Sequence, residues 1–167
     1  IIIFINSYMT TVISIAIITI CTVAIGAEGN DGNGNYSGQV RIYQNDNGTW
    51  TQIGSDIDGE AAYDGSGGSV SLSADGSIVA IGARYNDANG NSSGHIRIYQ
   101  NVKGTWTKIG SDIDGEAAND YSGGSVALSA DGSVVAIGAV GNAGVNGTNS
   151  GHVRIYQNVG GSWTKIG

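Results

Sequence analysis

The chain has 167 residues and a net charge of −7 at neutral pH, from fourteen acidic and seven basic side chains, which argues against nucleic acid and anionic membrane surfaces as partners. Hydrophobic residues make up 40% of the sequence, and 29 glycines occur with no proline, so the chain is rich in turns but has enough apolar residues for a core. The single cysteine, Cys21, excludes an internal disulfide and every cysteine-based zinc pattern.

The first 27 residues carry no charge and include ten isoleucines. Their length and hydropathy fit a membrane span or the core of a signal peptide, with "AIGA" at 24–27 as a cleavage site, although no Lys or Arg precedes the run. Residues 13–20 also stand where a first strand is expected. For residues 1–22 we therefore keep three interpretations open: a signal or membrane segment, the end of a fragment, and a first strand.

Three motifs recur along the rest of the chain. "VAIGA" begins at residues 23, 79 and 135, and therefore recurs every 56 residues, while "RIYQN" begins at 41, 97 and 154. The decapeptide "IGSDIDGEAA" occupies 53–62 and returns at 109–118. Self-similarity at a period of this size indicates repeated structural units, none of which can bury its apolar face alone.

Each repeat predicts four antiparallel strands and no helix. In "SVALSADGSVVAIGA", residues 125–139, apolar residues alternate on both sides of Asp131-Gly132, and an Asp-Gly pair in this setting predicts a hairpin. A polar loop precedes the third strand, in which Ile96 and Ile98 alternate with polar residues. A turn at 103–104 then leads into the fourth strand, "TWTKIG".

Four-stranded units of this length are typical of β-propeller blades, in which small sheets stack around an axis. The Ala and Gly residues of "VAIGA" would let neighbouring sheets approach closely. A stacked β-solenoid is the alternative, although its coils are usually shorter.

The stretches "SGGSVALSADGSVVAIGA" at 122–139 and "GHVRIYQN" at 151–158 resemble the FG-GAP repeats of integrin-alpha-like propellers, and the resemblance extends over residues 23–167. It implies an all-β fold made of consecutive four-stranded antiparallel blades of an incomplete β-propeller. Blade 1 would cover 23–64 in part, blade 2 would cover 65–120, and blade 3 would cover 121–167. The calcium loop of that family, DxDxDG, is shortened here to "SADGS" around Asp75 and Asp131.

The resemblance also implies a secreted or cell-surface module with a non-catalytic role in adhesion or recognition. Its partners would be an unknown protein or carbohydrate ligand and the remaining blades of a longer protein. The alternative is a purely structural scaffold or spacer within a larger enzyme or surface protein, with calcium as its candidate stabilising ion.

Acidic residues gather in and after the two decapeptides, and calcium prefers six to eight oxygen ligands. The candidate Ca²⁺ ligands are Asp56, Asp58, Glu60 and Asp64 in the first copy and Asp112, Asp114, Glu116 and Asp120 in the second. In an extended segment, Asp112, Asp114 and Glu116 would point to one side. The alternative is a solvated turn between blades, in which the aspartates cap their own backbone.

A second oxygen-rich loop, separate from the decapeptide, contains Asp31 and, in the next repeat, Asp87.

The two histidines, His95 and His152, occupy one repeat position, which is Gln39 in the first repeat. Because no nucleophile accompanies either one, we interpret them as strand histidines on a polar face and predict no enzyme activity and no catalytic residue. The aromatic residues at fixed repeat positions could form a carbohydrate-stacking surface or an inter-blade core, and the fixed position favours the core. They are Trp50, Trp106 and Trp163 with Tyr43, Tyr99 and Tyr156.

Overall fold

The computed structural model describes residues 21–144, 147 and 149–167. These residues form thirteen strands and no helix, so the predicted all-β fold is confirmed. No helix in the described part of the chain is long and apolar enough to cross a membrane. The interpretations of residues 1–22 lie outside the described residues, apart from Cys21 and Thr22, which belong to the first strand.

The strands form three antiparallel sheets that follow one another along the chain. The first sheet contains β1 (Cys21–Ala27), β2 (Gln39–Asp46), β3 (Thr49–Gln52) and β4 (Ile57–Asp58). The second contains β5 (Ser69–Leu72), β6 (Ile78–Ala83), β7 (His95–Val102), β8 (Thr105–Lys108) and β9 (Ile113–Asp114). The third contains β10 (Ser122–Leu128), β11 (Val134–Ala139), β12 (His152–Val159) and β13 (Ser162–Ile166). Each sheet thus arises from one sequence repeat.

The hairpin turns are built as the sequence predicts. In the turn between β5 and β6, Oδ1 of Asp75 accepts hydrogen bonds from the Ser73 hydroxyl at 2.7 Å and the Ser77 amide at 3.0 Å. The turn between β7 and β8 places Lys103 and Gly104 at φ values of 53° and 87°, the left-handed pair typical of a two-residue hairpin. These local interactions define the register of both hairpins.

The fourth strand of the second repeat is divided into two pieces. Both β8 and β9 pair with β7, and Gly110, at φ 72°, lies in the bend between them. Ile113 and Asp114, in the middle of the decapeptide, therefore still belong to the second sheet. Only from Gly115 onward does the decapeptide connect this sheet to the next one.

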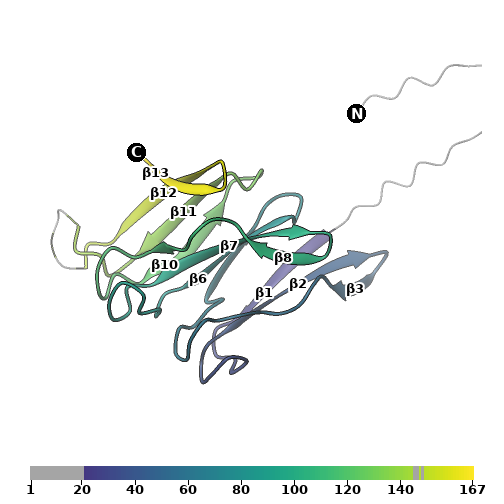
Figure 1. Ribbon diagram of the computed structural model, residues 1–167, viewed down its shortest axis with the longest axis horizontal. Helices are drawn as coiled ribbons and strands as arrows, with labels where there is room; N and C mark the ends of the chain where they lie inside the picture. The colour runs from purple at the N-terminus through teal and green to yellow at the C-terminus, as the bar shows by residue number, and fades with distance from the viewer. Residues whose placement is uncertain (1–20, 145–146, 148) are drawn as a thin grey trace, which may run out of the picture.

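The three sheets stack face to face in chain order, so the second sheet is covered on both faces (Figure 1). On one side, Val79 and Ile81 of β6 pack against buried residues of the first sheet, including Val40 and Ile42. On the other, Ile96 and Ile98 of β7 pack with Val135 and Ile137 of the third sheet. Burial of each such side chain contributes roughly 1.5–3 kcal/mol.

Glycines allow the sheets to approach at their closest points. A Cβ atom on Gly26 would lie 2.0 Å from the carbonyl oxygen of Gly67, and one on Gly82 would lie 2.2 Å from that of Gly123. The expectation that small residues of "VAIGA" permit close sheet packing is therefore confirmed.

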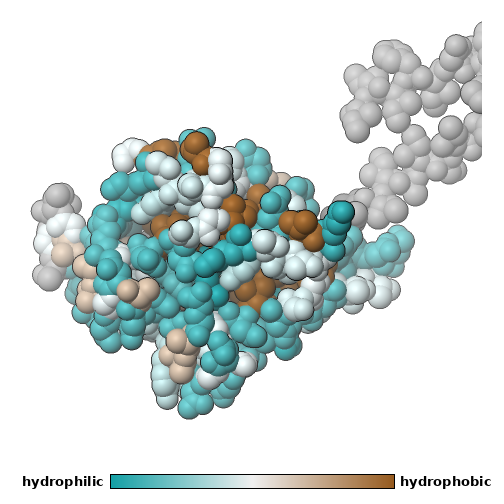
Figure 2. All heavy atoms as spheres, in the orientation of Figure 1, coloured by the Kyte–Doolittle hydropathy of each residue, from teal (hydrophilic) through white to brown (hydrophobic). Residues whose placement is uncertain are grey.

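The outer faces of the stack retain exposed apolar residues. Ile25 of the first sheet is 53% exposed, and Val153 of the third sheet is 67% exposed. In the view of Figure 2, a largely hydrophilic or intermediate surface is interrupted by hydrophobic residues near its middle and over β13.

Candidate functional site

Two of the predicted acidic residues are buried and hold the connector between sheets. Asp120 is 3% exposed, and its Oδ2 accepts hydrogen bonds from the amides of Glu116 and Ala117 and from Asn142 Nδ2, at 3.1, 3.0 and 2.9 Å. Asp64 repeats this role in the first copy, where it accepts from Ala61 and Asn86. These two aspartates cap their own backbone, but in a buried rather than a solvated turn.

Asp56 and Asp58, the first two candidate Ca²⁺ ligands, also bind side chains of the protein. Asp56 lies 3.0 Å from Arg41 and accepts from Gln52 at 2.6 Å; the hydrogen bond from Arg41 lowers the pKa of this carboxyl. Asp58 accepts from the side chain of Gln39 at 2.8 Å. Gln39 thus binds an acid at the repeat position where later repeats have histidine.

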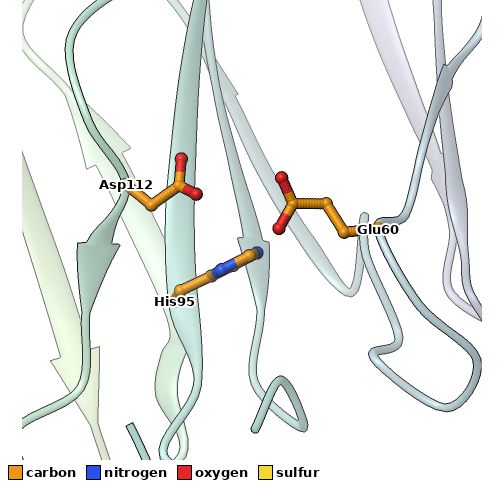
Figure 3. Close-up of side chains that lie close together, drawn as sticks. All are labelled: Glu60, His95 and Asp112. Atoms are coloured by element: carbon orange, nitrogen blue, oxygen red, sulfur yellow. The ribbon is translucent and has the colours of Figure 1, made fainter. Parts of the chain in front are cut away.

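Three other side chains meet between the first and second sheets. Ligand atoms of Glu60, His95 and Asp112 all lie within 4.8 Å of one another. Glu60 follows β4, His95 begins β7, and Asp112 precedes β9. Figure 3 shows the two carboxylates directed toward one another beside the His95 ring. The two decapeptide copies thus each contribute one carboxylate to a single cluster.

His95 shares its side of β7 with Arg97, but this side is buried, and only 1% of the His95 surface is exposed. The strand alternation places Ile96 and Ile98 toward the third sheet and therefore His95 toward the first sheet, which covers it. Burial, assisted by the positive charge of Arg97, lowers the pKa of the imidazole. His95 is therefore neutral at neutral pH, and neither of its ring nitrogens has a hydrogen-bond partner among the described residues.

Charged neighbours surround this cluster. Lys108 Nζ contacts Oδ1 of Asp112 at 2.8 Å, and Asp114 Oδ1 lies 3.9 Å from His95 Nδ1, beyond hydrogen-bonding distance. Arg97 Nη1 lies 3.6 Å from Oε1 of Glu60. Arg97 itself is held by hydrogen bonds from its Nη2 to the carbonyl oxygen of Asp58 at 2.8 Å and the hydroxyl of Ser66 at 3.2 Å.

Glu116 does not join Asp112 and Asp114 on one side. It contacts Arg154 of the third sheet, as Glu60 contacts Arg97 of the second. The chain leaves the extended conformation after the two-residue strand β9, so the alternation of a long strand does not apply there. Asp112 and Asp114 therefore both lie near His95, whereas Glu116 contacts the third sheet.

The shortened "SADGS" turns use their acids within the turn. Both carboxylate oxygens of Asp131 accept hydrogen bonds from the hydroxyl of Ser133, and Oδ1 also accepts from the hydroxyl of Ser129. The bond from Ser129 is the largest cause that lowers the pKa of Asp131 to about 2. Asp31 and Asp87 similarly accept from backbone amides of their own loops, those of Tyr36 and Ser92.

The repeated tryptophans link neighbouring sheets. Nε1 of Trp106 donates to the carbonyl oxygen of Ile53 at 2.8 Å, and Trp163 donates to Ile109 at 3.0 Å. Trp106 packs against the core between the first and second sheets, and Trp163 against the next one. For these two residues, the interpretation as inter-sheet core is correct.

A groove of about 640 Å³ lies between the loops of the first two repeats, a size typical of small-molecule sites. Three of its residues are exposed tyrosines: Tyr36 and Tyr63 are 60% and 62% exposed, and Tyr85 is 40% exposed. The rings of Tyr36 and Tyr63 stack with centroids 6.2 Å apart and an interplanar angle of 15°. Their φ values of 53° and 70° are unusual for bulky residues, but Ser92 and Asn119 share this left-handed conformation at the equivalent positions of the second repeat.

Polar groups also line this groove. Arg84 Nη2 lies 3.2 Å from Glu28 Oε1, and the Arg84 guanidinium carbon lies 4.6 Å from the centre of the Tyr85 ring. Glu28 Oε1 and Arg84 Nε are buried and have no hydrogen-bond partner among the described residues. The side chains of Arg84 and Glu28 are 42% and 38% exposed, so their remaining polar atoms can reach a ligand.

The sequence analysis missed this groove, although the repeats contain a signal for it. The position of Tyr36 is Ser92 in the second repeat, and that of Tyr63 is Asn119. Residues that differ between copies of an otherwise repeated unit are not required by the shared fold. This variation, rather than the repetition, marks the groove.

No protein-family model matches this sequence, and no curated protein is significantly similar to it.

Proposed function

We propose that the chain is a series of consecutive β-propeller blades, related to the FG-GAP repeats, that acts as a non-catalytic recognition or adhesion module outside the cell or at its surface. The stacking of one four- or five-stranded antiparallel sheet per repeat supports the blade assignment. In this proposal, residues 23–64, 65–120 and 121–167 are the three blades, and further blades of a longer protein are among its partners.

The observation that carries the recognition role is the groove between the loops of the first two repeats. Its tyrosines are exposed, and two of them are stacked. The repeated backbone does not require these tyrosines, because the second repeat has Ser92 and Asn119 at the same positions with similar φ values.

A neutral carbohydrate is the ligand class that this groove fits best. Tyrosine rings provide flat apolar faces for the C–H side of a sugar ring, and their hydroxyl groups can hydrogen bond. The partly exposed side chains of Glu28 and Arg84 add an acceptor and a donor for sugar hydroxyls. The net charge of −7 further disfavours polyanionic ligands.

The second repeat supplies substitutions that the backbone tolerates. In the double variant Tyr36→Ser, Tyr63→Asn, each tyrosine is replaced by the residue that stands at the equivalent position with a similar φ, namely Ser92 at 48° and Asn119 at 64°. We expect the unchanged chain to bind an oligosaccharide on a glycan array, and isothermal titration to show that the double variant has lost this binding. The control is Asn119→Ser, at the matched position outside the groove.

The alternative function, a structural spacer, predicts a different result. A chain that binds no glycan, or a double variant that binds as well as the control, would contradict the carbohydrate proposal. Unchanged melting temperatures of both variants would show that any loss of binding comes from the groove and not from unfolding.

A further inference from the structure

We propose that Glu60, His95 and Asp112 form a binding site for a divalent transition-metal ion, with Zn²⁺ the best-matched ion, that clamps the first sheet to the second. This proposal is independent of the carbohydrate groove. It rests on the convergence of one imidazole and two carboxylates, whose ligand atoms lie within 4.8 Å of one another.

The state of His95 points to a ligand. A buried polar group without a hydrogen bond is costly, by roughly 1–3 kcal/mol, and native structures rarely leave one. His95 is 1% exposed, and both ring nitrogens are unpartnered among the described residues. Figure 3 shows a ring nitrogen directed toward the carboxylate of Glu60. A metal ion between them would provide a partner for one of the two ring nitrogens.

The two carboxylates are accessible and retain ligand capacity. The side chains of Glu60 and Asp112 are 44% and 22% exposed, so an ion can enter from solvent. Lys108 contacts Oδ1 of Asp112, and Arg97 approaches Oε1 of Glu60, which leaves a second oxygen of each carboxylate to bind a cation. Arg97 is also anchored by its two hydrogen bonds to Asp58 and Ser66, so it does not depend on Glu60.

The donor set selects the class of metal. Calcium and magnesium take oxygen ligands, whereas an imidazole nitrogen with carboxylate oxygens suits zinc and related transition metals. Three protein ligands with one open position is a common arrangement for zinc. The cluster therefore differs from the all-oxygen calcium site that the acidic decapeptides first suggest.

The other repeats provide natural controls. The first repeat has Gln39 where the second has His95, and Gln39 is also buried, at 7% exposed. His95→Gln is therefore a substitution that a strand of this type accommodates. His152, the third-repeat equivalent, faces Glu116 and Arg154 but lies outside the cluster, so His152→Gln is the matched control.

The test is titration of the full chain with zinc chloride by calorimetry, together with Co²⁺ as a spectroscopic substitute. We expect one Zn²⁺ per chain and visible absorption bands from bound Co²⁺.

His95→Gln should weaken Zn²⁺ binding by about 100-fold or more, since changes to groups that only support a metal ligand already cost 10- to 100-fold. His152→Gln should leave affinity and spectrum unchanged. Glu60→Gln, at an exposed carboxylate that the fold does not need, should weaken binding without affecting the circular dichroism spectrum.

Three results would overturn the proposal. The first is a chain that binds no Zn²⁺, and the second is a His95→Gln variant that binds Zn²⁺ as well as the His152→Gln control. The third is a melting temperature that calcium raises as much as zinc does, with that gain lost in Asp112→Asn but kept in His95→Gln. This last pattern would restore the calcium interpretation. If His95→Gln does not fold, the Glu60→Gln titration alone decides between binding and no binding at the cluster.

Discussion

The indole nitrogen of Trp106 donates a hydrogen bond to the carbonyl oxygen of Ile53, 2.8 Å away in the preceding sheet. Trp163 makes the same bond to Ile109 at 3.0 Å. Ile53 and Ile109 are the first residues of the two copies of the repeated decapeptide. The decapeptide therefore carries an acceptor that attaches each sheet to the next one, which is one reason for its repetition.

Loss of this bond should weaken the interface between the first two sheets. We expect Trp106→Phe to lower the free energy of unfolding by about 1 kcal/mol, because the ring keeps most of its packing but the carbonyl loses its donor. Trp50→Phe is the matched control: Trp50 has the same repeat position, is 49% exposed, and has no acceptor among the described residues. It should change stability by less than about 0.5 kcal/mol. Urea unfolding of both variants measures the difference. Equal effects would contradict a stabilising role of the hydrogen bond from Trp106 to Ile53.

The glycine contacts between sheets give a second matched pair. In Gly82→Ala, the new Cβ would meet backbone of the third sheet, the Gly123 carbonyl oxygen at 2.2 Å. We expect destabilisation of about 1–3 kcal/mol, because the sheets must move apart. In Gly138→Ala, at the equivalent position of the third repeat, the nearest atom is the Ser125 hydroxyl oxygen, which can rotate away. A loss of stability in Gly138→Ala as large as in Gly82→Ala, measured by thermal unfolding, would argue against the steric explanation.

The strands were predictable because their signals are local. Alternation in 125–139 and the Asp131-Gly132 pair indicate β10, its turn and β11 without any knowledge of the rest of the chain. The turn at Lys103-Gly104 is equally local. The repeat period then indicates that the same unit occurs more than once.

The site was only partly predictable, because alternation assigns a residue to a face but does not say what covers that face. His95 was expected on the polar side of its strand, but the sequence does not indicate that the first sheet buries this side. Glu60 and Asp112 were candidates, but their meeting with His95 depends on how one repeat stacks on the next. The tyrosine groove also arises between repeats, and its tyrosines, Tyr36, Tyr63 and Tyr85, signal it in the sequence only by differing from their counterparts.

Acid should weaken the turn at Asp131. Its folded-state pKa of about 2 lies below the ordinary value of 3.8, with the Ser129 hydroxyl as the largest cause. The stabilisation is therefore complete above about pH 4 and is lost as the pH falls toward 2. We expect Asp131→Asn to be less stable than the unchanged chain at neutral pH and equally stable near pH 2. Melting temperatures across this range test whether the stability of the variant approaches that of the unchanged chain. A difference in melting temperature that stays constant with pH would contradict this prediction.

The connector should depend on Asp120. Its buried carboxylate accepts hydrogen bonds from two backbone amides and from Asn142, and Asp120→Ala would leave all three donors without this acceptor. We expect a loss of about 3 kcal/mol. Asp46→Ala, at an exposed acid whose side chain accepts from the neighbouring Asn47, should change stability by less than about 0.5 kcal/mol. Chemical unfolding provides both values, and a small effect at Asp120 would mean that water can replace its hydrogen bonds.

The exposed outer faces of the first and third sheets predict head-to-tail association of two copies. The first sheet presents Ile25 and Trp50, whose repeat equivalents Ile81 and Trp106 pack against the preceding sheet. The third sheet presents Ile155, whose equivalent Ile98 packs against the following sheet. Each outer face thus repeats one side of an interface that already exists inside the molecule.

The third sheet also presents Ile166, the counterpart of the tryptophan acceptors Ile53 and Ile109. The carbonyl oxygen of Ile166 is therefore the acceptor expected for Trp50 of a second copy. A contact of this kind joins two different faces, so it produces open chains or closed rings and not a simple symmetric dimer. We expect oligomers that grow with concentration in sedimentation experiments at micromolar protein.

Two single substitutions separate this arrangement from contacts between identical faces. Ile25→Asp places a charge on the outer face of the first sheet, and Ile155→Asp places one on that of the third; both residues are exposed, at 53% and 42%, so the fold should tolerate them. In head-to-tail association each variant retains one good face and is monomeric alone, because its good face has no complementary partner. An equimolar mixture should form a one-to-one dimer and nothing larger, since only one productive interface remains.

If either variant dimerised by itself, identical faces would be pairing. If the unchanged chain were monomeric at every concentration, the outer faces would not associate at all. Val102→Asp, at a 50% exposed valine in the hairpin between β7 and β8, controls for the added charge and should assemble like the unchanged chain.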